Sequence, residues 1–185
     1  GKLRLVITCY LIRSQDQTIL VDAGMRFAPG IEGEGHLLNG LRDLGVQPED
    51  VQTVVFSHLH GDHVGWNVSQ DDGEHRATFP NARYIIQRPE WEHFTRPEMR
   101  ERPNVMNQLL PLESLGVLEL REGDFDLTSE VKARVSAGHT PGHTTLDIES
   151  EGEKAFVFSD IAVHHVQLTE PDWFLQFDAE PEIAR

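Results

Sequence analysis

The feature that most constrains this chain is an apolar run, residues 54–56, that breaks into a cluster of possible metal ligands. The run is typical of a buried strand. The ligand-type residues that come after it are His58, His60, Asp62 and His63. Imidazole nitrogens and carboxylate oxygens are the ligands that zinc and similar divalent metals prefer. A polar loop with incidental histidines is the alternative, since the chain has 10 histidines in 185 residues.

The spacing within this cluster indicates how the side chains would be shared. His58 and His60 alternate, so on extended backbone they point to the same side and can bind one ion. Gly61 allows a sharp turn that aims Asp62 and His63 at a neighbouring point. One short loop could therefore serve two metals.

Two later clusters also come after predicted strands, at 131–136 and 155–158. His139 stands in a Gly/Pro turn and is predicted to be a third ligand to the ion held by His58 and His60. Asp160 could give one oxygen to each of two ions, which would offset the cost of burying a carboxylate. His143 is expected to hydrogen-bond its loop or a ligand rather than a metal.

The remaining pattern predicts strands that come in sets, with helical pieces between them. Strands are expected at 3–12, 18–21, 82–87, 117–120 and 144–148, helices at 37–44, 89–94 and 99–112, and a polar surface loop at 69–76. Pro111 is expected to end the third helical piece. Such an order suggests a sheet-on-sheet core with helices packed outside. Asp22, at the end of the second strand, either caps the next segment or orients a ligand histidine.

Length and charge limit the class of protein. With 185 residues we expect a single domain over 1–185, and the formal net charge of −15 argues against nucleic acid or an anionic membrane as partner. No signal peptide or membrane-length apolar run is visible, so a cytoplasmic location is predicted. Cys9 is the only cysteine and is interpreted as a buried small hydrophobe.

Taken together, the motif His58-x-His60-x-Asp62-His63, the downstream His139 and Asp160, and residues 19–24 resemble the metallo-β-lactamase fold superfamily. The resemblance implies an α+β fold, a four-layer αββα sandwich with metals at one edge of the sheets. Carried over by position, it implies that His58, His60 and His139 bind one metal, and that Asp62 and His63 bind a second, with Asp160 bridging them. Two Zn²⁺ ions would be expected in the full-length protein, with Fe or Mn as alternatives.

The presence of Asp160 at the bridging position is similar to the lactonase, glyoxalase II and phosphotriesterase-like branches. Residues 61–67, with Gln167, 171–173 and Phe177-Asp178, are similar to the branch of N-acyl homoserine lactonases and methyl parathion hydrolase. The family's last histidine ligand lies a few dozen residues beyond the bridging aspartate, and only 25 residues come after Asp160. We therefore expect the sandwich to be incomplete at the C-terminus, with His164 or His165 as possible substitutes for that ligand.

These observations predict a metal-dependent hydrolase in which a hydroxide between two metals attacks a lactone or activated ester. Asp62 and Asp160 are the candidate catalytic groups, which would orient the nucleophile and carry a proton. The small-molecule substrate could be a phosphotriester instead, and a homodimer is compatible with the sequence. A different class, one iron held by His58, His139 and Asp160 as in persulfide dioxygenases, is also open. A third interpretation is a non-enzymatic domain that binds one metal structurally. Trp66, Trp91, Phe94 and Trp173 line the substrate pocket or belong to the core.

Overall fold

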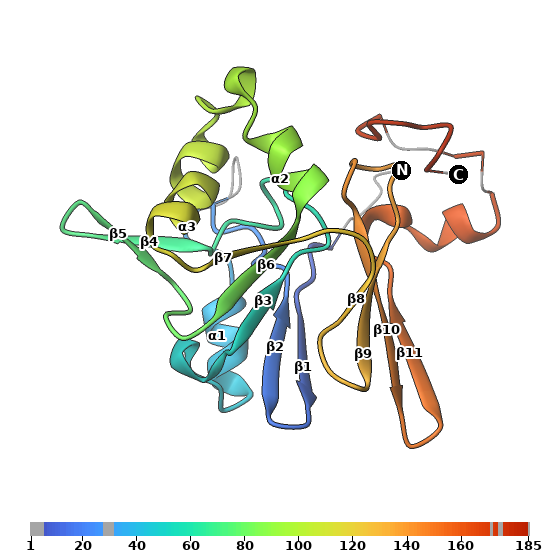
Figure 1. Ribbon diagram of the computed structural model, residues 1–185, viewed down its shortest axis with the longest axis horizontal. Helices are drawn as coiled ribbons and strands as arrows, with labels where there is room; N and C mark the ends of the chain where they lie inside the picture. The colour runs from blue at the N-terminus through green and yellow to red at the C-terminus, as the bar shows by residue number, and fades with distance from the viewer. Residues whose placement is uncertain (1–5, 28–31, 171, 174–175, 185) are drawn as a thin grey trace.

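The computed structural model describes residues 6–27, 32–170, 172–173 and 176–184, which form two β-sheets packed face to face (Figure 1). The first sheet contains, in spatial order, β1 (Tyr10–Ser14), β2 (Gln17–Val21), β3 (Thr53–Val55), β6 (Arg83–Gln87) and β7 (Leu118–Arg121). The second contains β11 (Glu153–Val157), β10 (Thr144–Ser150), β9 (Val131–Val135) and β8 (Phe125–Asp126). A separate hairpin consists of β4 (Val68–Asp71) and β5 (Glu74–Ala77).

The helical elements are short. They are α1 (Leu37–Asp43), α2 (Arg88–Phe94), α3 (Leu110–Ser114), the π-helical turn η3 (Val105–Leu109), and the 3₁₀ turns η1 (Pro48–Asp50), η2 (Pro97–Met99), η4 (Ser159–Ile161) and η5 (His165–Leu168). In Figure 1, α1, α2 and α3 lie on the side of the first sheet that faces away from β8–β11.

Alternation along the strands of the first sheet explains why it is covered on both faces. Leu20, Val54 and Tyr84 point to one face and belong to the cluster that also contains the buried side chains of α1, α2 and α3. Their neighbours Val21 and Ile85 point to the other face and pack against the second sheet. The sandwich therefore has one core between helices and sheet and another between the two sheets.

The predicted α+β sandwich is confirmed, with helices against the five-stranded sheet. The outward face of the four-stranded sheet carries charged side chains and the exposed Phe156, and no α-helix of the described residues covers it. Arg134 and Asp147 pair across this face at 3.4 Å. No helix in the described part of the chain is long and apolar enough to cross a bilayer.

Three local predictions were wrong. The first strand begins at Tyr10 rather than at residue 3, because Tyr10 pairs with Val21, where β2 ends; residues 6–9 have no regular structure and residues 1–5 lie outside the described ones. The predicted loop at 69–76 is the β4–β5 hairpin, whose turn has the positive φ angles of a type I′ turn at Asp72 and Gly73. Pro111 does not end the helix, because the π-helical turn η3 runs directly into α3, which continues past Pro111 to Ser114.

Candidate metal centre

The ends of several strands meet at one edge of the sandwich. β2 and β3 run parallel, so their carboxyl ends lie together, and β10 begins at the edge where the antiparallel β11 ends. The backbone N–H of Thr144 donates to the carbonyl of Ser57 over 2.8 Å, which joins the two sheets at this edge. The loops after β3 and β11 and the loop that precedes β10 therefore converge.

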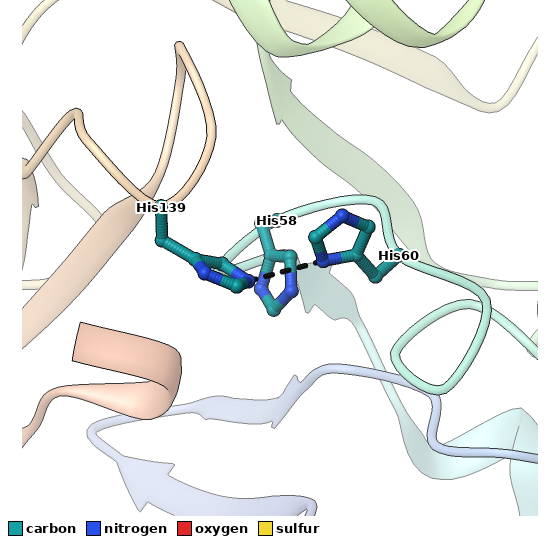
Figure 2. Close-up of side chains that lie close together, drawn as sticks. All are labelled: His58, His60 and His139. Carbon is teal, nitrogen blue, oxygen red and sulfur yellow. Dashed lines mark hydrogen bonds between the residues drawn. The ribbon is translucent and has the colours of Figure 1, made fainter. Parts of the chain in front are cut away.

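Three imidazoles from two of these loops form the first candidate ligand group. One ring nitrogen of each of His58, His60 and His139 lies within 4.8 Å of the others. Figure 2 shows the three rings turned toward one another, with Nε2 of His139 3.1 Å from Nδ1 of His60. His58 and His139 are buried, and His60 is partly exposed. The arrangement could hold one divalent cation.

Asp160 lies between this group and a second one. Its Oδ2 atom is 3.8 Å from Nε2 of His58 and 3.7 Å from Nε2 of His139. Its Oδ1 atom is 3.7 Å from Nε2 of His63, and that nitrogen is 3.6 Å from Oδ2 of Asp62. His58, His63 and Asp160 form the second group that could hold a metal. The two oxygens of Asp160 thus face different histidines, and His58 belongs to both groups.

The donor set fits a divalent cation. Nε2 of His58 is buried and has no hydrogen-bond partner among the described residues, although a buried polar atom is normally satisfied. It points toward Asp160, whose side chain is about a quarter exposed and reaches the same place from the other sheet. An ion bound by this nitrogen would satisfy it, and nitrogen and carboxylate ligands together suit a metal such as zinc.

The pKa values of two imidazoles at the centre keep them in the neutral form that metals bind. Burial lowers the pKa of His58 well below its usual value and that of His60 to about 4. Burial also opposes protonation of His63, but Asp22 and Asp160 outweigh it and raise its pKa to about 10. Burial would raise the pKa of Asp160, but the neighbouring histidines, His63 first, lower it. A neutral imidazole and an ionised carboxylate are the ligating forms.

Two buried carboxylates orient the ligand rings from behind. Asp22 accepts hydrogen bonds from Nδ1 of His63 at 2.9 Å, from the hydroxyl of Ser57 at 2.7 Å and from the Ser57 N–H at 2.8 Å. Of the two roles left open for Asp22, the contacts support the one that orients a histidine. Asp178 lies 2.8 Å from Nδ1 of His139 and plays the same part for that ring. This role of Asp178 was not predicted, since no local signal in the sequence links it to His139.

Other predicted residues lie near the centre or outside it. His143 is fully buried, and its ring centroid is 5.3 Å from that of His58. Neither of its ring nitrogens has a hydrogen-bond partner in the described residues, so the predicted hydrogen bond to its own loop is not found. His164 accepts a hydrogen bond from the N–H of Val166 and, like His165, belongs to neither ligand group. Of the four aromatic residues considered for the substrate pocket, Trp66, Trp91 and Phe94 belong to the core and Trp173 is exposed.

A cavity of about 320 Å³ lies beside the ligand loop. Gly61, which stands between His60 and Asp62, lines it together with Arg26, Asn104 and other residues of the loop around 25–27 and of η3. None of the candidate ligands lines this cavity, but Gly61 and Gly65 of its lining flank Asp62 and His63 in the chain. A larger cavity of about 620 Å³ lies between residues 6–11 and α1, and none of the candidate ligands lines it.

Comparison with known proteins agrees with this geometry. The family model described as the metallo-beta-lactamase superfamily matches residues 4–172. An N-acyl homoserine lactonase of Bacillus thuringiensis is 29% identical over 170 residues, a match that covers 82% of this chain and 62% of that protein. The chain therefore spans less than two thirds of the length of this relative.

Solved structures show the same likeness. AidC, a dizinc quorum-quenching lactonase in complex with its product N-hexanoyl-L-homoserine, superposes with a TM-score of 0.76 at 26% identity, over 95% of this chain and 64% of that one. The hydrolase AbOPH in the beta lactamase superfamily superposes with a TM-score of 0.77 at 27% identity, over 91% of this chain and 60% of that one.

Proposed function

The chain belongs to the metallo-beta-lactamase superfamily, and on that premise we propose that it is a metal-dependent hydrolase that opens lactones or other activated esters. The observation that carries the proposal is the position of Asp160, whose Oδ2 atom faces His58 and His139 while its Oδ1 atom faces His63. A single structural ion would not require a carboxylate that reaches both groups. Relatives named as N-acyl homoserine lactonases, one of them dizinc, support the substrate class and the metal.

We assign the ligands accordingly. His58, His60 and His139 would hold one Zn²⁺, Asp62 and His63 would hold a second, and Asp160 would contact both. When bound there, such ions supply Lewis-acid polarisation of a carbonyl group and a hydroxide nucleophile near neutral pH.

The catalytic groups that the chain itself provides are Asp62 and Asp160. Their side chains are about a third and a quarter exposed, so they can exchange protons with water, which the more buried His58 and His63 cannot do directly. Asp160, between the two groups, would orient the attacking oxygen, and a carboxylate oxygen of Asp62 would take up its proton and pass it to the leaving alkoxide. The cavity lined by Gly61, the neighbour of Asp62 in the chain, offers room for the acyl part of the substrate.

The test combines metal content with turnover. We expect elemental analysis of the purified protein to find two zinc ions per chain, and a pH-stat to record opening of a medium-chain N-acyl homoserine lactone. Asp160→Asn should abolish turnover, whereas Asp147→Asn, a change of equal charge on the outer sheet face, should not. If the protein binds two ions and hydrolyses a phosphotriester but not the lactone, phosphotriesters would replace lactones as the proposed substrate class. One iron per chain would instead favour the iron site of His58, His139 and Asp160.

A further inference from the structure

A single buried carboxylate connects the two loops that carry the imidazole ligands. Glu90, in the first turn of α2, is 1% exposed. Its Oε1 atom accepts the N–H of Leu59 at 3.0 Å, and its Oε2 atom accepts the N–H of Gly142 at 2.8 Å. Leu59 stands between His58 and His60, and Gly142 stands three residues after His139 in the other ligand loop. Each oxygen of Glu90 thus holds one loop.

The second ligand loop packs closely against α2 at Gly142. A Cβ atom on Gly142 would lie 2.6 Å from the backbone nitrogen of Glu90 and 2.7 Å from its Cβ atom. Glycine is therefore required there by the close approach of the loop to α2. The helix itself is fixed, because Trp91 and Phe94 are buried in the core between the helices and the first sheet. Glu90 is therefore presented by a rigid element.

We propose that Glu90 is a positioning residue that sets the distance between the two ligand loops, so that His58, His60 and His139 form a ready-made site for a metal ion. The proposal rests on the metal centre proposed above but not on the reaction that it catalyses. Only a carboxylate can accept from both loops at once, since an amide of the same size has one acceptor oxygen. The second N–H would then be buried without a partner, and that loop would move to satisfy it.

If Glu90 had a purely structural role, its loss would lower stability without a specific effect on Zn²⁺ binding. A matched variant that removes similar hydrogen bonds elsewhere separates this role from the positioning role. Thr128 is also buried and accepts two backbone N–H groups, the part-buried one of Glu130 at 3.2 Å and the buried one of Val131 at 3.1 Å. It lies beside Ser14, at the end of β1 opposite the metal centre. Thr128→Val removes these bonds without touching a ligand loop.

The experiment compares Glu90→Gln and Thr128→Val with the unmodified protein in three measurements. These are the Zn²⁺ dissociation constant by chelator competition, the absorption spectrum with Co²⁺ in place of Zn²⁺, and the urea midpoint of the metal-free protein. We expect both variants to lower the urea midpoint. Only Glu90→Gln should weaken Zn²⁺ binding, by about tenfold or more, and change the Co²⁺ spectrum, which reports the ligand geometry.

The outcomes are distinct. Unchanged Zn²⁺ affinity and Co²⁺ spectrum in Glu90→Gln would overturn the positioning role and leave the metal centre standing. An unmodified protein that binds no divalent ion would overturn both. If Glu90→Gln does not fold, Gly142→Ala tests the spacing of the two loops directly, because its Cβ atom pushes the second loop away from α2 while the carboxylate remains. Tight Zn²⁺ binding by a folded Gly142→Ala protein would contradict the proposal.

Discussion

Replacing Asp22 with asparagine removes one charge behind a proposed metal ligand and keeps the shape of the side chain. Asparagine tolerates the left-handed backbone of Asp22, which has a φ of 61°. Its remaining oxygen can still accept the N–H of Ser57, which donates to Oδ1 in the native protein. The new NH₂ group then takes the place of Oδ2 and faces the Ser57 hydroxyl and Nδ1 of His63.

The magnitude depends on the tautomer of His63. In the native protein Asp22 accepts a hydrogen bond from Nδ1, so that Nε2 of the neutral ring is free to bind a metal. The asparagine NH₂ donates to Nδ1 and so favours the tautomer that carries its proton on Nε2. Removing an outer carboxylate of this kind weakens metal binding by about 10- to 100-fold, or about 1.4 to 2.7 kcal/mol.

Chelator competition with Zn²⁺ measures the effect for each ion. We expect the ion of the His63 group to be bound about 10- to 100-fold more weakly in Asp22→Asn. The ion of the three imidazoles should be less affected, because Asp22 reaches that group only through the Ser57 hydroxyl, which lies 3.1 Å from Nδ1 of His58. Asp147→Asn, which removes an equal charge from an exposed ion pair, should leave both affinities unchanged. If Asp22→Asn bound both ions as tightly as the native protein, the reasoning from the tautomer would be refuted.

Three more predictions concern other parts of the molecule. Asp178→Ala removes the carboxylate beside Nδ1 of His139 and should weaken Zn²⁺ binding about tenfold in the same competition assay; unchanged affinity would contradict its orienting role. Gly61→Val should raise the KM for a long-chain acyl lactone about tenfold at an unchanged urea midpoint, because the added Cβ atom has ordinary contacts with Asn104 but the side chain enters the cavity. An equal rise for a short-chain lactone would show that the cavity does not hold the acyl chain. Burial raises the pKa of the Cys9 thiol to about 12, so iodoacetamide should modify the folded protein far more slowly than the urea-unfolded protein at the same pH, as followed by mass spectrometry. Equal rates would mean that the thiol is not shielded.

The first half of the candidate metal centre could be predicted because its residues are close in the chain. His58, His60, Asp62 and His63 lie within six positions directly after an apolar strand, and local backbone geometry alone brings them together. In the first sheet, the strands that form the inter-sheet core were also visible as apolar runs, whereas β9 and β10 alternate apolar and polar residues. The β4–β5 hairpin was missed because its strands are polar, although the Asp-Gly pair at its turn was a usable signal.

The contacts that orient the ligands could not be predicted in this way, because they join distant parts of the chain. Asp178 is 39 residues from the histidine that it contacts, and Glu90 is 31 and 52 residues from the two N–H groups that it accepts. These distances close only when helix α2 packs on the first sheet and the second sheet packs on its other face. No periodicity or spacing in the sequence records that arrangement.

The buried carboxylates give a physical reason for the chain to bind a cation at this edge. Asp22 and Glu90 are 2% and 1% exposed, and within the described residues neither pairs with a lysine or an arginine. The positive charge nearest to Asp22 is that of His63, whose pKa Asp22 and Asp160 together raise to about 10. Buried anions held mainly by neutral donors are costly, and a divalent ion bound through Nε2 of His63 would bring a larger positive charge to the same place. The residues that orient the ligands therefore also make the site electrostatically favourable for the ion, so that metal binding and the order of the two ligand loops should stabilise each other.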